Sequence, residues 1–285
     1  MLGLVLSGGG AYGAFQVGVL EGMLETNPEL PWYDIFCGVS VGALNGAYLA
    51  QYEGPTAAIE DLSSLWDNLD TPDVYRNWFP FGFLQAFWEN SFYRTDPLAR
   101  MISENLDLDF IKTSGKKLRI GAVSQNTGEY RVFDQTDDDL HAAVLASSAF
   151  PLMFEPVKFD GNLWVDGGVR NVTPLKAAID AGATEIDVIV TEAVEASPVF
   201  KASPKNLAQS GMQILGTMVN EITMMDLKYA ELYNRLLAHE DVPGKRPVNI
   251  RIISPGSPLP GSPLDFSPNH NAEVSEIGYE VGMML

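Results

Sequence analysis

The residue with the clearest chemical potential is a serine set between two glycines, in the run Gly38-Val39-Ser40-Val41-Gly42. The apolar run 34–39 predicts a short buried strand, and the stretch that Ser40 opens predicts a helix through about Gln51. A strand, a tight turn and a helix around G-x-S-x-G are typical of a nucleophile elbow, which presents the serine hydroxyl at the start of the helix. The alternative is a glycine-rich turn without a catalytic role, because the bare motif is short enough to occur by chance.

A second glycine run, Ser7 to Gly13, follows the apolar run Leu2–Leu6 and precedes a predicted helix. Its G-x-G-x-x-G spacing fits a dinucleotide site, which requires an acidic residue at the end of the next strand to bind the ribose. Asp34 lies at about the right distance but at the start of that strand, so this interpretation is weak. Adjacent parallel strands bring both turns to one sheet edge, where the N–H groups of the glycine run can stabilise an oxyanion beside Ser40.

A catalytic serine needs a base, and the ordinary choice is histidine. His141 follows three aspartates at a predicted helix start, which favours a solvated cap. His239 near a charged helix end and His270 after a proline-rich loop remain alternatives as third members of a Ser-Asp-His triad.

Asp166 is the stronger candidate for the base. The segment 157–165 predicts a β-hairpin around Asp160-Gly161, and Asp166-Gly167-Gly168 leaves that hairpin at its end. The two glycines allow the backbone to approach another element closely. Taken alone, an Asp-Gly-Gly run indicates only a turn.

The elements that position these residues alternate between strands and helices, which predicts an α/β fold with a mostly parallel sheet covered on both faces. Besides those above, strands are predicted at 118–123, 129–134, 186–190 and 248–254, and helices at 14–25, 56–69, 96–105, 139–147, 174–181, 203–238 and from 271 onward. The 285 residues are 46% apolar and 19% charged, which predicts a single compact domain spanning 1–285. Its motifs lie in a core of about 1–195, and residues 196–285 add helices and a proline-rich loop.

The charge balance limits the partners. With 18 basic and 37 acidic residues, the net charge is −19 and no basic cluster is present, so we expect no nucleic-acid partner and no electrostatic adhesion to anionic lipid. Three histidines and the single cysteine, Cys37, leave little material for a metal site. The uncharged run Leu2–Leu20 is too rich in glycine for a signal peptide or a membrane span, so we expect a soluble, cytoplasmic protein.

Taken together, these motifs resemble the patatin-like phospholipase family. The resemblance covers about residues 1–195 and is carried by four ordered motifs. They are Gly8-Gly9-Gly10-Ala11-Tyr12-Gly13 with Gly18-Val19-Leu20, then Gly38-Val39-Ser40-Val41-Gly42-Ala43, then Ala146-Ser147-Ser148-Ala149-Phe150-Pro151 with Phe154, Pro156 and Val157, then Asp166-Gly167-Gly168 with Asn171 and Pro174.

The resemblance implies a three-layer α/β/α fold and a lipid acyl hydrolase with a Ser-Asp dyad that uses no histidine, metal or cofactor. Ser40 would be the nucleophile and Asp166 the general base. The backbone N–H groups of Gly9 and Gly10, together with Gly8, would form the oxyanion hole, and a cluster of motif glycines would support these residues. The supporting glycines are Gly13, Gly38, Gly42, Gly167 and Gly168.

The sequence departs from the family at Tyr12, where the family usually carries Arg or Lys after the glycine run. The missing cation weakens the case for phospholipids and leaves simpler acyl esters open; Arg94 and Arg170 are candidates to replace it in space. Four methionines, Met212, Met218, Met224 and Met225, fit a core-facing helix better than an acyl-binding surface.

The aromatic segment 78–93 is a candidate acyl-binding wall or a surface that touches a membrane transiently; a core-filling role is the alternative. The residues for such membrane contact are Trp78, Phe79, Phe81, Phe83, Phe87 and Trp88.

Three other functions fit the sequence less well. They are a non-lipid carboxylesterase, thioesterase or acyltransferase with the same dyad, a catalytically idle lipid-binding protein, and a nucleotide-binding module. The substrate of the favoured function is a lipid or another acyl ester.

Overall fold

The computed structural model describes the chain except for residues 81–87, 195–203, 205–206 and 240–246, and except for the side chains of 207–209, 212, 238 and 239. Among the described residues, eight strands form one sheet in the order β10-β9-β1-β2-β5-β8-β7, with β6 also paired to β5. The strands are β1 (Leu2–Leu6), β2 (Ile35–Gly38), β5 (Lys117–Ser124), β6 (Tyr130–Asp134), β7 (Val157–Phe159), β8 (Asn162–Asp166), β9 (Glu185–Ile189) and β10 (Asn249–Ile253). A separate pair is formed by β3 (Arg76–Asn77) and β4 (Tyr93–Arg94).

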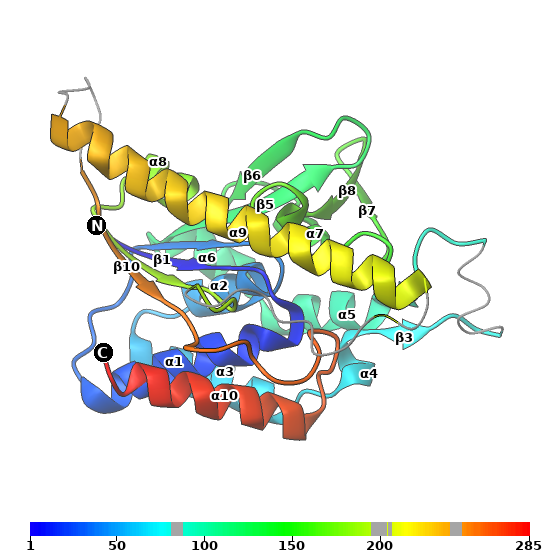
Figure 1. Cartoon of the computed structure of the whole chain (residues 1–285), viewed down its shortest axis with the longest axis horizontal. Coiled ribbons are helices and arrows are strands. Elements are labelled where there is room, and N and C mark those ends of the chain that lie inside the picture. Colours follow the sequence, from blue (N-terminus) through cyan, green and yellow to red (C-terminus); the bar gives the residue numbers. More distant parts are fainter. Residues whose placement is uncertain (81–87, 195–203, 205–206, 240–246) are drawn as a thin grey trace.

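The sheet is parallel from β10 through β9, β1 and β2 to β5, whereas β6 and β8 pair antiparallel to β5. The helices are α1 (Gly13–Thr26), α2 (Val41–Ala50), α3 (Pro55–Asn68), α4 (Thr71–Val74), α5 (Asp96–Asn105), α6 (Leu108–Thr113), α7 (Leu140–Ser147), α8 (Leu175–Ala181), α9 (Leu207–His239) and α10 (Pro268–Gly282). Helices α8 and α9 cover one face of the sheet, and α1, α3 and α10 lie on the other (Figure 1). The predicted α/β fold with three layers is confirmed.

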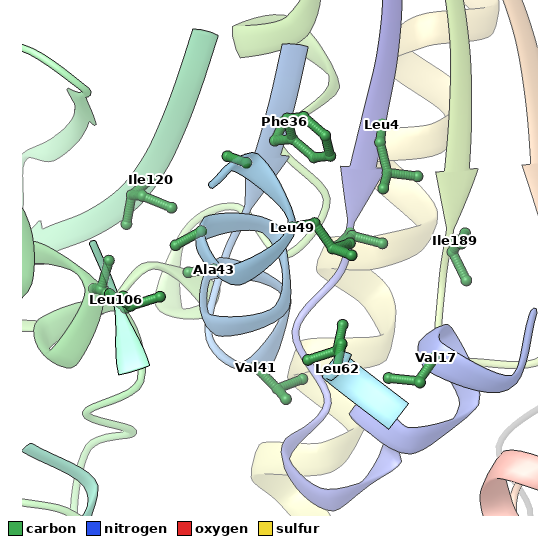
Figure 2. Close-up of a cluster of buried hydrophobic side chains, with 14 of the residues drawn as sticks. Leu4, Val17, Phe36, Val41, Ala43, Leu49, Leu62, Leu106, Ile120 and Ile189 are labelled. Atoms are coloured by element: carbon green, nitrogen blue, oxygen red, sulfur yellow. The ribbon is translucent and has the colours of Figure 1, made fainter. Parts of the chain in front are cut away.

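The alternation of side chains along the strands divides the core between these faces. Val5 of β1 and Cys37 of β2 pack with α8 and α9. Leu4 and Phe36, one residue away on the same strands, pack with the helices of the other layer. Figure 2 shows this second cluster, in which the strand residues meet α2. Each central strand is buried on both faces, which is why its sequence reads as an apolar run without alternation.

The carboxyl-terminal region packs against the first half of the chain. Helices α1 and α10 approach so closely that a Cβ atom at Gly18 or Gly278 would collide with the backbone of the opposite helix. The loop before α10 reaches the glycine run, where the Ala11 N–H donates to Pro263 O at 2.9 Å. Residues far beyond the family motifs therefore help to position them.

Most predicted elements match the structure within a few residues. The final helix begins at Pro268, three residues before the predicted start, because proline fits the first helical position without losing a hydrogen bond. The short helices α4 and α6 and the pair β3–β4 are absent from the sequence predictions, since none is long enough to show a periodicity. None of the helices in the described ranges combines the length and apolarity needed to cross a membrane.

Candidate active site

Ser40 lies in the tight turn between β2 and α2, as the motif predicts. Its backbone has φ 56° and ψ −131°, a conformation that non-glycine residues rarely adopt and that costs on the order of 1–3 kcal/mol. The flanking glycines are required by close packing: a Cβ atom at Gly38 would collide with Gly42, and one at Gly42 would collide with Leu6 O. The backbone is therefore strained at Ser40, and the turn is possible because Gly38 and Gly42 have no side chain that would collide.

The register of the sheet brings the glycine run level with this turn. Leu6, the last residue of β1, pairs with Gly38, the last residue of β2, in the parallel orientation. The loops that follow both strands consequently leave from the same edge. A Cβ atom placed on Gly8 would lie 3.2 Å from the Ser40 Cβ, so the two turns are in contact.

Asp166 reaches the same edge by a route that depends on β5. Strands β2 and β6 overlap in their pairing with β5 and so occupy its two opposite sides. Strand β8 overlaps β6 as well, and therefore continues on the side that β2 leaves after pairing with Ile120. Asp166 pairs with Ala122, two residues beyond Ile120, which is the level that Ser40 occupies two residues beyond Gly38. The ends of β2 and β8 thus face each other.

The backbone of Ser40 is held by two neighbouring serines. The Ser40 N–H donates to Ser147 Oγ at 3.0 Å, and that hydroxyl donates in turn to Gly121 O at 2.7 Å. The Ser148 hydroxyl donates to Ser40 O at 3.3 Å. Both serines belong to the third family motif, but the sequence analysis assigned them no role because their partners are distant in the chain.

Asp166 is almost completely enclosed, with 1% of its surface exposed. Its Oδ1 accepts the Gly168 N–H at 2.7 Å. Burial raises the pKa of Asp166 to about 7, although the Gly168 N–H and the nearby Ser40 hydroxyl both favour the charged form. Oδ2 accepts no hydrogen bond of regular geometry within the described residues, and so remains available beside the serine.

The loop after Asp166 is tied to α9 by a residue that the sequence analysis missed. Asp226 accepts the N–H groups of Val172 and Thr173 at 2.9 and 3.0 Å. Burial raises the pKa of Asp226 to about 6. An acidic residue on a helix gives no sequence signal that it accepts hydrogen bonds from a loop more than 50 residues away.

Five of the seven N–H groups in the glycine run have backbone partners, including those of Ser7 and Gly13, which leaves two as candidates for an oxyanion site. The Gly8 N–H donates to Val172 O at 3.2 Å, the Ala11 N–H to Pro263 O, and the Tyr12 N–H to Gly9 O. The N–H groups of Gly9 and Gly10 have no such acceptor in the described part of the chain. Gly10 has φ +59°, and a Cβ there would collide with Pro263 O, so only glycine fits.

Two cavities meet at Ser40. The larger, of about 170 Å³, is bounded by the glycine run, Asp166 and Glu192, and by apolar side chains of α9 and the loop before α10. The smaller, of about 60 Å³, extends into the core between α2, α3 and α5 and is lined almost entirely by apolar side chains, including Trp66 and Leu98. Both are bordered by Gly10, Ser40, Ser148, Phe154 and Phe266.

No cationic side chain of the described residues lines either cavity. Arg94 pairs with Asp96 and stacks on Trp78, and Arg170 donates to Gly128 O at 2.7 Å. Neither takes the place of the cation that the family usually carries at the position of Tyr12.

The two histidines whose side chains the structure describes do not join Ser40. His141 hydrogen-bonds Leu106 O, and His270 hydrogen-bonds Ser262 O with its ring against Tyr12. Neither lines the cavities at Ser40. The side chain of His239 lies outside the described residues. Within the described ranges, no three His, Cys, Asp or Glu side chains gather in a way that could hold a metal ion.

The described part of the aromatic segment 78–93 is exposed at 79–80 and 88–90, whereas Trp78, Phe92 and Tyr93 are half-buried. Phe79 and Trp88 are 86% and 79% exposed, and no described member of the segment lines the cavities, which corrects the expectation of an acyl-binding wall for those residues. Phe81, Phe83 and Phe87 lie outside the described residues. The core-facing interpretation of the methionines is wrong for Met218 and Met225, which are 56% and 60% exposed on α9.

Comparison with known proteins supports the same family. The model of the patatin-like phospholipase family matches residues 4–179. YjjU of Escherichia coli is 26% identical over 271 residues, which are 90% of this chain and 69% of that protein. The probable lipid hydrolase 463L of Invertebrate iridescent virus 6 is 26% identical over 187 residues, 62% of each protein. The protein R571 of Acanthamoeba polyphaga mimivirus is 26% identical over 174 residues, 58% of this chain and 57% of the viral protein.

Among solved structures, VipD from Legionella pneumophila superposes with a TM-score of 0.55 over 99% of this chain and 66% of its own, at 15% identity. That likeness concerns the fold. The match of the family model covers more than half of the chain, and the motifs it contains are those assembled around Ser40. The chain therefore belongs to the patatin-like phospholipase family, whose name denotes hydrolases of the carboxylic esters of lipids.

Proposed function

We propose that the protein hydrolyses acyl esters of lipids through a dyad of Ser40 and Asp166 and an acyl-enzyme intermediate. One observation carries the proposal. A serine in a strained elbow shares a cavity with a buried carboxylate and with two N–H groups of the glycine run. Among the described residues, the carboxylate Oδ2 accepts no hydrogen bond of regular geometry, and the two N–H groups have no backbone acceptor. These are the nucleophile, base and oxyanion donors that acyl transfer requires.

In the first half of the reaction, Ser40 Oγ attacks the ester carbonyl carbon while Asp166 Oδ2 accepts the hydroxyl proton. The negative charge that develops on the carbonyl oxygen is stabilised by the N–H groups of Gly9 and Gly10. The bond to the alcohol oxygen then breaks, and Asp166 returns its proton to that oxygen. The alcohol leaves, and the acyl group stays on Ser40.

In the second half, a water molecule takes the place of the alcohol. Asp166 accepts a proton from the water, whose oxygen attacks the acyl carbon, and the same N–H groups stabilise the second oxyanion. The bond to Ser40 Oγ breaks, Ser40 recovers its proton, and the carboxylic acid leaves. A carboxylate with a pKa of about 7 serves better here than an ordinary aspartate, because its basicity is matched to neutral pH.

The two cavities fit the two parts of an ester. The 60 Å³ cavity is apolar and ends in the core, which suits the acyl chain. The 170 Å³ cavity is also lined mostly by apolar side chains, but it contains Asp166 and Glu192, whose polar groups suit the alcohol. An apolar cavity of about 150 Å³ binds benzene, so 60 Å³ holds about two to three carbons beyond the carbonyl. Short acyl groups are therefore the expected substrates.

The function is tested by hydrolysis of p-nitrophenyl esters with acyl chains from acetyl to palmitoyl. We expect turnover with the highest kcat/KM at propionyl or butyryl, which have two and three carbons beyond the carbonyl. An enzyme that cleaves only long chains would contradict the assignment of the smaller cavity. Absence of turnover on every ester, together with binding of neutral lipid vesicles, would replace the proposal by a lipid-binding function.

Leu98 on α5 is expected to set the acyl length. It lines the smaller cavity and is 2% exposed, so Leu98→Ala lengthens the space available to the chain. We expect the optimum in kcat/KM to move two or more carbons toward longer chains, at a cost of about 2–5 kcal/mol in stability. Ile102→Ala is the matched control, because Ile102 is buried on the same helix without lining the cavity. A shift of the same size in both variants would refute the assignment.

Exposed apolar side chains that are sequence neighbours of residues lining the larger cavity, here called the cavity rim, support transient contact with a lipid surface. Leu152 is 58% exposed beside the cavity residues Phe150 and Met153, and Ile214 is 59% exposed beside Leu215. Hydrogen bonds from Phe92 and Tyr93 to the 152–153 backbone connect this rim to the aromatic segment. A protein with a net charge of −19 requires apolar contact, since anionic headgroups repel it.

The contact is tested with vesicles of neutral phosphatidylcholine. We expect the double variant Leu152→Glu/Ile214→Glu to reduce co-sedimentation at least about threefold, because each substitution places a charge where a side chain would enter the lipid. Leu236→Glu is the control, at an equally apolar and 49% exposed position near the other end of α9. An equal loss of co-sedimentation in the double variant and in Leu236→Glu would indicate that the whole helix, and not the cavity rim, contacts lipid.

A further inference from the structure

Glu192 is a carboxylate in the larger cavity that the proposed reaction does not use. It follows β9 by three residues and lines the cavity together with Ser40 and Asp166. No hydrogen bond or ion pair holds it in the described part of the chain. Burial alone raises its pKa, as expected for a carboxylate that has lost water without gaining a partner. A group in this state is available to bind a substrate.

Tyr12 borders the same cavity and lies close to Glu192. Its hydroxyl donates to Gly261 O at 3.3 Å, which leaves the lone pairs of the oxygen free to accept. Burial and the charge of Glu192 together raise the pKa of Tyr12 to about 12, so the phenol stays neutral. The polar side chains facing the alcohol part of a substrate are thus hydrogen-bond acceptors.

The sign of charge in this cavity is unfavourable for phosphate. Sites that bind phosphate supply Arg or Lys, and the described lining contains neither. Asp166 and Glu192 both carry negative charge above their pKa values, and a phosphate group entering between them would be repelled in a partly dehydrated space. Hydroxyl groups are neutral donors, and a carboxylate and a phenol oxygen are suitable acceptors for them.

We propose that Glu192 and Tyr12 select esters whose alcohol part is uncharged and carries free hydroxyl groups, as glycerol does, and that they disfavour alcohol parts bearing phosphate. The inference rests on the proposed ester hydrolysis and names its substrate class. Glu192 acts as a specificity determinant, because it contacts the alcohol part of the substrate and not the reacting bond.

The test compares two substrates that differ only in the phosphate, 1-butyrylglycerol and its 3-phosphate, at pH 8. We expect wild-type kcat/KM to favour the neutral ester at least about tenfold, and Glu192→Gln to reduce that ratio at least about fivefold by removing the charge. Glu185→Gln, at an exposed position at the start of β9, is the control and should keep the wild-type ratio. Equal kcat/KM for the two esters in the wild type would overturn the proposal, as would an unchanged ratio in Glu192→Gln.

A binding measurement separates failure of this inference from failure of the proposed function. Calorimetric titration of Ser40→Ala with both esters reports selectivity without turnover, and Ser40→Ala/Glu192→Gln supplies the comparison. We expect the first variant to bind the neutral ester more tightly and the second to lose most of that difference. If p-nitrophenyl butyrate and both glycerol esters stay intact with wild-type protein, ester hydrolysis is refuted, and the calorimetric ratio alone decides the selectivity.

Discussion

Replacing Ser40 by alanine is expected to lower kcat/KM for p-nitrophenyl butyrate by at least about 10⁴-fold, because removal of a nucleophile leaves only binding and oxyanion stabilisation. The fold should survive the change. The hydrogen bonds at this residue use its backbone N–H and C=O, which alanine keeps, and the strained turn is supported by its neighbours. Circular dichroism and the melting temperature of the variant check that the loss is chemical.

Ser148 provides the matched control, because it is a second serine that borders both cavities. Its hydroxyl donates to Ser40 O and to Val144 O, so we expect Ser148→Ala to lower kcat/KM less than about tenfold by loosening the turn. Mass spectrometry after reaction with a fluorophosphonate ester provides an independent readout. If the reagent labels Ser148 in place of Ser40, or if Ser40→Ala is active, the assignment of Ser40 as the nucleophile is wrong.

The turn that carries Ser40 could be predicted from sequence because its determinants are local. Two glycines, an apolar strand and a helix with small residues specify the elbow without reference to the rest of the chain. The contact between the glycine run and Ser40 required one further step, the parallel pairing of successive strands, which is a frequent arrangement in α/β proteins. The structure confirms that pairing.

The position of Asp166 in the fold was harder to predict from the sequence. The sequence indicates a hairpin ending at this residue, but not that β8 continues along the side of β5 that β2 vacates. Pairing of this kind depends on strand lengths and on which sheet edge is free, and neither is encoded near Asp166. The resemblance to a known family implied a role for Asp166, and the topology shows how its strand reaches the edge of the sheet at Ser40.

Two other features could not be predicted from the sequence, because they too depend on contacts between distant parts of the chain. Glu192 follows a strand with no motif around it, and only the assembled cavity shows that it has no hydrogen-bond or ion-pair partner among the described residues. Gly8 matched the family motif, but its N–H donates to Val172 O, more than 160 residues away in the chain. Our oxyanion proposal therefore rests on Gly9 and Gly10. Long-range backbone pairing decides which N–H groups of a glycine-rich turn are free, and spacing does not reveal it.

Asp166→Asn is expected to remove activity and to stabilise the protein at the same time. The amide keeps an oxygen for the Gly168 N–H but cannot take a proton from Ser40, so we expect kcat/KM to fall at least about 10³-fold. For the wild type, kcat/KM should rise with pH and level off above about 7, where Asp166 is ionised. The active carboxylate is thus the buried, charged form, which is unfavourable for folding.

The effect of pH on stability has a definite sign. The folded protein holds a proton on Asp166 up to a pKa of about 7, whereas an unfolded aspartate releases it near 3.9. Between these values the folded state binds more protons, so the wild-type free energy of unfolding falls as pH rises from about 4 to 7. At about 1.4 kcal/mol per pKa unit, the loss reaches about 4 kcal/mol. Asparagine stays neutral at every pH, so Asp166→Asn does not lose this stability.

Urea denaturation of both proteins at pH 5 and pH 8 tests this directly. The stability of Asp166→Asn relative to wild type should be greater at pH 8, by about 2–3 kcal/mol, because most of the titration of Asp166 falls between these values. Asp226 and Glu192, whose pKa values burial also raises, titrate in both proteins and largely cancel in the difference. An equal difference at both pH values would show that Asp166 has an ordinary pKa in the folded protein. In that case the site would hold a weak base, and general-base catalysis by Asp166 near neutral pH would lose its physical support.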